Sequence, residues 1–124
     1  MSVKVDLDRL AETLGNFSFA YLVTVGDDYR AHTVAVDPVL SGGGVRIASV
    51  GTRTGRNAAA HPDVTLVWPP REPGGYTLII DGRAEVDGNG IRVQPNSAVL
   101  HRKPKPDSPP SVSGCGDDCV PLNG

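Results

Sequence analysis

Residues 50–57, VGTRTGRN, join a strand-like segment to a helix-like one and carry two threonines and two arginines in a short space. The preceding residues 45–50, VRIASV, have the alternation of a strand, and the alanines at 58–60 favour a helix. That helix must end near His61, because Pro62 disfavours helical geometry in the residue before it. We therefore expect a strand, a donor-rich turn and a short helix in this order.

The sequence on either side of this stretch is typical of strands joined by glycine-rich turns. Two β-branched and aromatic runs within 19–36 flank Gly26-Asp27-Asp28, which is a hairpin signal. The other strands are expected at 45–50, 64–68, 76–86 and 91–95. Gly82 indicates a bulge or bend in the long strand. The pattern also predicts a helix over 6–14, a turn over 37–44 and one helical turn over 96–102.

These elements favour a mostly β fold, a six-stranded antiparallel barrel with short flanking helices. Several strands are apolar on both faces, as at 21–23 and 78–80. A barrel that buries only one face of its sheet does not need this second apolar face. We therefore expect a partner on the outside of the barrel and predict a homodimer.

The chain divides by composition into a domain and a tail. Residues 1–102 hold all the expected strands and helices. Residues 103–124 are rich in proline and lack periodic apolar residues, which predicts an extended or disordered tail. Cys115 and Cys119 both lie in that tail, so the domain is expected to fold without a disulfide.

The composition argues against several classes of function. A net charge of -2 disfavours a duplex-binding surface, and an aromatic content of 5% leaves few stacking platforms for single strands. No apolar run approaches the ~20 residues of a membrane span. The charged N-terminal residues 1–14 are unlike a signal peptide, so a soluble, cytoplasmic protein is expected.

The residue types at 50–57 indicate a candidate anion-binding site. A helix that follows a strand exposes its first N–H groups at the positive end of its dipole. Thr52 and Thr54 add hydroxyl donors, Arg53 and Arg56 add forks that suit a phosphate, and Asn57 can bond at the helix start. The structural alternative is that a threonine caps the helix and that the arginines are only solvated.

In order and spacing, these elements resemble the pyridoxamine 5'-phosphate oxidase-like split β-barrel family, which includes deazaflavin-dependent enzymes. The matching segments are AYLVTVGDDYRAHTVAV, TRTGRNAAAHPDVTLVW, DGRAEV and VQPNSAVLHR, within residues 7–102. The resemblance implies a cofactor, FMN or the deazaflavin coenzyme F-420, in a cleft between two subunits. Many members carry Ser-Arg-Lys where this chain has Thr52-Arg53-Thr54, so Arg56 or Arg30 is the candidate replacement for the lysine.

The resemblance also implies which residues bind the cofactor. They are Thr52, Arg53, Thr54, Arg56 and Asn57 at the phosphate, with His32 and Trp68 as further candidates for the pocket. From the sequence alone, a lone strand histidine is more often structural, and a tryptophan before Pro69-Pro70 is more often a core or interface anchor.

Three functions stay open at this point. The first is an oxidoreductase that transfers hydride to or from a small molecule of unknown identity. The second is a non-catalytic flavin or deazaflavin carrier or sensor, and the third is a dimeric interaction domain without a cofactor. No metal site is expected, because Cys115 and Cys119 offer only two thiolates where a closed zinc site needs four ligands.

Overall fold

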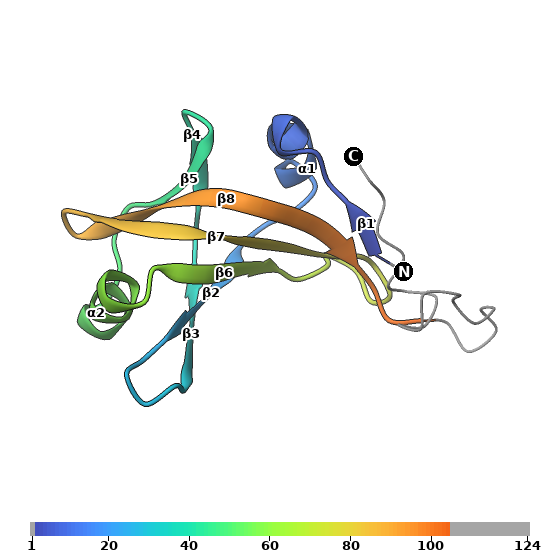
Figure 1. Ribbon diagram of the computed structural model, residues 1–124. Coiled ribbons are helices and arrows are strands. Elements are labelled where there is room, and N and C mark those ends of the chain that lie inside the picture. The colour runs from blue at the N-terminus through green and yellow to red at the C-terminus, as the bar shows by residue number, and fades with distance from the viewer. Residues whose placement is uncertain (1, 105–124) are drawn as a thin grey trace.

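The computed structural model describes residues 2–104, which form an eight-stranded sheet and two short helical regions (Figure 1). In chain order the elements are β1 (Ser2–Lys4), η1 (Leu7–Arg9), α1 (Leu10–Leu14), β2 (Ala20–Val25), β3 (Ala31–Val36), β4 (Val39–Ser41), β5 (Gly44–Ile47), α2 (Thr52–Ala60), β6 (Asp63–Trp68), β7 (Thr77–Asp87) and β8 (Gly90–His101). Their strand pairings are antiparallel. The expected mostly β, antiparallel fold is confirmed.

The two ends of the sheet meet at a seam. The strand order is β3-β2-β6-β7-β8-β5-β4, with β1 added to β8, so β3 and β4 stand at opposite ends. Yet only Asp37 and Pro38 separate these strands in the chain, so Val36 and Val39 are at most about 11 Å apart. The sheet therefore curls into a barrel whose closing seam has no strand pairing, which makes it a split barrel.

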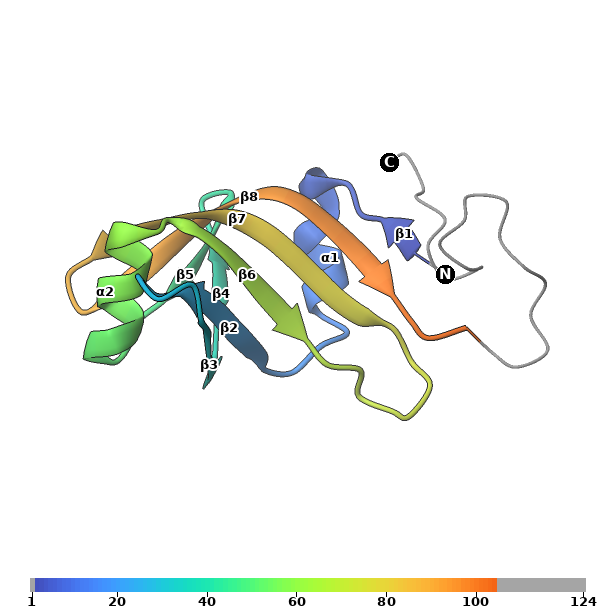
Figure 2. The ribbon, with the colours of Figure 1, turned by 60° about the horizontal axis from the view of Figure 1, so that its bottom comes forward.

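The inward faces of the strands form the core. Alternate residues of β2 and β6 are buried, among them Leu22 and Leu66, which are both 0% exposed. The helix α2 packs against β7 and β2 and buries Ala58. Both ribbon views place α2 at the opposite end of the barrel from β1 (Figures 1 and 2). The molecule thus has two distinct ends, one at α2 and one at α1 and β1.

Gly82 interrupts the long β7–β8 ladder, as its position in the sequence predicts. The register shifts between Asp81 and Gly82. A Cβ atom on Gly82 would lie 2.6 Å from the carbonyl oxygen of Gln94, a separation that atoms in proteins do not tolerate. The glycine is therefore required by the close approach of the two strands.

Three parts of the predicted secondary structure are wrong. The strands number eight rather than six, because 2–4 and 39–41 are also strands. The segment 37–44 is a β4–β5 hairpin around Gly42 and Gly43, whose positive φ angles of 57° and 81° allow the tight reversal. The expected helical turn at 96–102 is instead the end of β8, where β7 and β1 pair with its two edges.

An apolar row crosses the outer face of the sheet. The strand register places Ala35, Tyr21, Val67, Ile79 and Val99 side by side on β3, β2, β6, β7 and β8. Tyr21 is 39% exposed although its neighbours across the strands are apolar. This row is the two-faced hydrophobicity that the sequence indicates.

In the part of the chain described, no helix has the length and apolar character needed to cross a bilayer. The predicted tail from 103 onward lies outside the described residues, apart from Lys103 and Pro104.

Candidate functional site

The helix α2 begins earlier than the sequence suggests. Residues 52–57 are its first turns rather than a separate turn, and Gly51 is the N-cap in an extended conformation. The backbone bond from Gly55 N to Gly51 O, 3.0 Å long, is the first of the helix. The N–H groups of Thr52, Arg53 and Thr54 come before that bond, so the helix supplies no acceptor for them. They lie at the positive end of the helix dipole.

The threonines of this first turn do not cap it. No side chain bonds to the N-cap end of α2, so the structural alternative of a threonine cap is wrong. Thr54 is only 2% exposed, and its hydroxyl has no hydrogen-bond partner within residues 2–104. A buried hydroxyl that lacks a partner is costly, and most buried polar groups in proteins are paired. The hydroxyl of Thr54 is therefore available to form a hydrogen bond with a group that is not part of residues 2–104.

Thr54 lines a cavity at the seam of the barrel. The cavity has a volume of about 310 Å³ and lies between β3 and residues 49–54. From β3 it is lined by His32, Val34 and Val36, which are half-buried. The cavity therefore joins an apolar strand surface to the donor-bearing start of α2, and His32 lines it.

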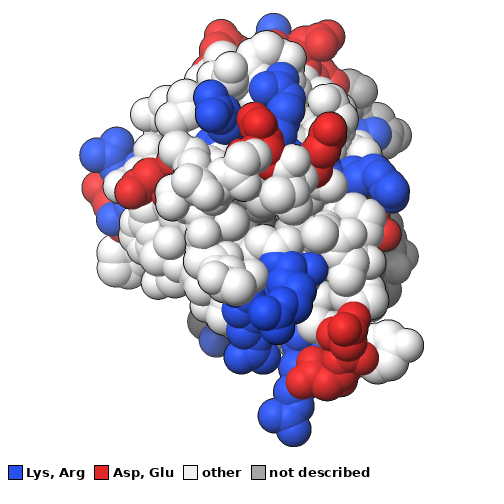
Figure 3. Space-filling view, turned by 90° about the vertical axis from the view of Figure 1, so that its left-hand side faces the viewer, with Lys and Arg blue, Asp and Glu red and all other residues white. Residues whose placement is uncertain are grey.

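A second cavity of about 510 Å³ lies on another side of the same helix turn. Thr52 and Arg53 line both cavities, and Arg56 lines only the second of these two. Neither arginine forms an ion pair within the described residues. Figure 3 shows basic and acidic side chains gathered on this end of the molecule. The two guanidinium groups are thus available to an anion.

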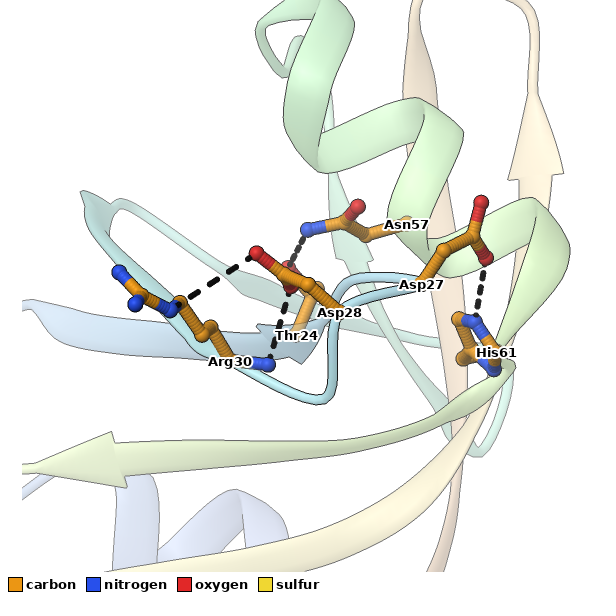
Figure 4. Close-up of polar contacts among 6 residues, drawn as sticks. All are labelled: Thr24, Asp27, Asp28, Arg30, Asn57 and His61. Atoms are coloured by element: carbon orange, nitrogen blue, oxygen red, sulfur yellow. Dashed lines mark hydrogen bonds and ion pairs between the residues drawn. The ribbon is translucent and has the colours of Figure 1, made fainter.

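The acidic neighbours of these arginines are already paired (Figure 4). Asp27 Oδ1 lies 2.8 Å from His61 Nε2 at the end of α2. Asp28 accepts a 3.1 Å hydrogen bond from the backbone N–H of Arg30, whose Nε lies 4.0 Å from Asp28 Oδ2. The side chain of Arg30 is 83% exposed and makes only this long contact within residues 2–104, and Arg30 does not line the second cavity, whereas Arg56 does.

Asn57 lies in the interior of α2 and not at its start. It is 7% exposed, and its Nδ2 donates a 3.2 Å hydrogen bond to Thr24 Oγ1 of β2 (Figure 4). The bond fastens the helix to the sheet. Asn57 also lines the second cavity, so it borders the candidate site while its side chain holds the helix in place.

Trp68 is placed apart from the other candidates. It is 2% exposed at the end of β6 and belongs to the hydrophobic core. It lines neither of the two cavities beside α2. Trp68 is therefore part of the hydrophobic core, as expected for a core anchor.

Asp27 and Asp28 border the site although the sequence pattern marks them only as a hairpin turn. Both line the second cavity, because the β2–β3 hairpin turns directly beside α2. Within residues 2–104, no three His, Cys, Asp or Glu side chains are grouped in a way that could hold a metal ion. Cys115 and Cys119 lie outside that range.

Solved structures with the same arrangement identify the fold. A pyridoxamine 5'-phosphate oxidase described as putative, from Listeria innocua, has a TM-score of 0.62 at 15% identity and covers 76% of this chain and 96% of its own. A FAD-binding protein from Mesorhizobium loti has a TM-score of 0.63 at 12% identity, covering 81% and 96%. An F420 reductase has a TM-score of 0.58 at 18% identity, covering 70% and 94%.

The chain has the pyridoxamine 5'-phosphate oxidase-like fold. The resemblance in the sequence is confirmed at the level of this fold. No protein-family model matches the chain. Over 133 aligned residues it is 46% identical to the uncharacterized proteins Mb0449c of Mycobacterium bovis and MT0457 of Mycobacterium tuberculosis, covering 94% of each chain. It belongs to the same family as these two proteins. In this chain, the seam cavity lies beside the start of α2.

Proposed function

We propose that this protein binds FMN or the deazaflavin coenzyme F-420 at the barrel seam and transfers hydride to or from a small molecule. The observation that carries the proposal is the buried, unpaired hydroxyl of Thr54 at the N-terminal turn of α2. It lies beside free helix N–H groups and the unpaired Arg53, which together form a donor set suited to a phosphate. The names of two fold neighbours mention FAD and F420, which supports a cofactor of this class.

Each part of the site has its own task in this proposal. Arg53 and Arg56 bind the phosphate, and the start of α2 orients it. The apolar residues Val34 and Val36 and the side chain of His32 face the rest of the cofactor along the seam. When bound, such a cofactor supplies the hydride chemistry, so the protein needs only to hold it and exclude water.

We further propose that a second copy of the chain covers the seam. The apolar row on the outer face ends at Ala35, which also lines the seam cavity. An interface on that row would therefore continue to the mouth of the cavity. Isologous pairing of one face on itself is the commonest way in which soluble proteins form dimers.

Cofactor titration tests the phosphate site. FMN and F-420 are titrated separately into the parent protein, Arg53→Ala and Arg71→Ala, with absorbance and fluorescence as readouts. Loss of a charge-assisted contact worth about 1.5–3 kcal/mol predicts roughly ten- to a hundredfold weaker binding in Arg53→Ala. Arg71→Ala, at the other end of the barrel, is the matched control and keeps the parent affinity. Equal binding by Arg53→Ala and the parent would show that the phosphate does not lie there.

Two further measurements separate the remaining possibilities. Turnover of the reduced cofactor with an added acceptor distinguishes an enzyme from a carrier or sensor, and uptake of neither cofactor favours a cofactor-free interaction domain. Sedimentation at micromolar concentration reports the dimer, and Tyr21→Glu is expected to shift it to monomer because it places a charge in the apolar row. A monomeric parent protein would contradict the shared site.

A further inference from the structure

A third cavity lies at the other end of the barrel, away from α2. It is an open cavity with a volume of about 630 Å³, bordered by the end of α1, the loop between β6 and β7, and the end of β8. Cavities of roughly 300–1,000 Å³ are typical of small-molecule sites. It shares no lining residue with the two cavities beside α2, so it is separate from the proposed cofactor site.

The loop that forms its rim is stiff. Residues 69–76 read PPREPGGY, and their three prolines restrict the backbone. Glu72 O accepts a 3.1 Å hydrogen bond from Gly75 N, with Pro73 and Gly74 between them. The φ of Gly74 is 81°, as a type II turn with proline in its second position requires. The rim is therefore formed in advance of any ligand, which lowers the entropic cost of binding.

Two opposite charges stand on this stiff rim. Arg71 and Glu72 both line the cavity and are exposed. Neither forms an ion pair with another side chain in the range 2–104. The mouth of the cavity thus offers one cation and one anion in neighbouring positions.

The cavity lining combines polar residues, among them Thr13 and Asn16, with apolar and aromatic ones. Phe17 and Leu100 line it and pack against the hydrophobic core. Tyr76 also lines it, and the guanidinium carbon of Arg102 lies 4.7 Å from the centre of the tyrosine ring. This cation–π contact helps to fix the ring in place.

We propose that this cavity binds a free α-amino acid with an aromatic side chain. Arg71 pairs with its carboxylate and Glu72 with its ammonium group. The aromatic side chain enters the cavity against Phe17 and Tyr76. A zwitterion matches the two neighbouring rim charges, whereas a simple anion or cation would leave one of them facing a like charge.

Calorimetric titration with L-phenylalanine tests the proposal. The comparison ligands are 3-phenylpropionate, which lacks the ammonium group, and phenethylamine, which lacks the carboxylate. Each is expected to bind at least about tenfold more weakly than L-phenylalanine, because one charge-assisted contact is lost. Equal binding of all three would show that only the aromatic ring is recognised and would overturn the proposal.

Variants at the rim separate this site from the cofactor site. Arg71→Ala and Glu72→Gln are each expected to weaken L-phenylalanine binding by about tenfold or more. Arg53→Ala is the matched control and keeps the parent affinity for the amino acid. Both rim residues are exposed, so circular dichroism should show unchanged folding. No detectable heat with L-phenylalanine at millimolar concentration, or unchanged binding in Arg71→Ala, would refute the assignment whatever the cofactor titration finds.

Discussion

The first and last turns of α2 differ in how their polar groups are paired. At the last turn, Asn57 O accepts a 2.7 Å bond from His61 N, the Asn57 amide bonds to Thr24, and the His61 ring contacts Asp27. At the first turn, the hydroxyl of Thr54 and the guanidinium of Arg53 have no partner within residues 2–104. The polar side chains named here are therefore paired at the end of α2, its satisfied end, and unpaired at its start, its unsatisfied end.

This difference separates residues that hold the fold from residues available to a ligand. A paired buried group stabilises the folded chain, and removing one member leaves the other exposed to its full desolvation penalty. An unpaired buried group costs stability in the free protein and recovers that cost only when something binds. The two ends of α2 should therefore respond in opposite ways to substitution.

The largest expected effect is at the satisfied end. Asn57→Leu removes the donor to Thr24, whose hydroxyl is 0% exposed and is then left unpaired. The expected loss of folding free energy is about 1–3 kcal/mol, measured by urea denaturation. In the double variant Thr24→Val/Asn57→Leu neither partner is left unpaired, so part of that loss should be recovered. A double variant less stable than the sum of both single changes would contradict the pairing.

A smaller, opposite effect is expected at the unsatisfied end. Thr54→Val keeps the shape of the side chain and removes a hydroxyl that has no partner. The free protein should keep or slightly gain stability, while cofactor binding should weaken by up to about tenfold. Thermal unfolding with and without cofactor measures both. A clear loss of stability in the free protein would mean that the hydroxyl is already satisfied, and the comparison would fail.

The smallest effect is expected at the contact between His61 and Asp27 at the end of the helix. The side chains of His61 and Asp27 are 38% and 89% exposed, so water and salt screen their attraction. His61→Ala is expected to cost at most about 1 kcal/mol. Asp27→Asn should give a similar or smaller loss, because the asparagine oxygen can still accept a hydrogen bond from His61. A loss as large as that of Asn57→Leu would mean that the His61–Asp27 contact, and not Asn57, holds α2 against the sheet.

The long strands could be predicted from the sequence because their own residues alternate. The hairpin at 19–36, the strand at 64–68 and the bulge at Gly82 are all found where the pattern places them. The short strands β1 and β4 could not, since three residues carry too little pattern and pair only because β8 and β5 are present. The end of β8 likewise could not be predicted, because its two neighbouring strands decide its conformation.

The sequence predicted which residue types stand at the candidate site better than it predicted how their side chains are oriented. Thr52, Arg53 and Thr54 do stand at a helix start, and His32 joins them at the seam. Their role in cofactor binding stays a prediction. The inward direction of Thr54 and the burial of Asn57 depend on which face of α2 meets the sheet, and the short helix carries too few apolar residues to fix that face.

The β7–β8 hairpin has a consequence for the order of folding. Its two long strands are joined by only Gly88 and Asn89, so forming it closes a very short loop. The pairing of β1 with β8, where Ser2 lies opposite His101, instead joins residues from nearly opposite ends of the described chain. Contacts so distant in sequence form slowly. We expect pulse-labelled amide exchange during refolding to protect residues 77–101 first and to leave β1 as the last strand to dock.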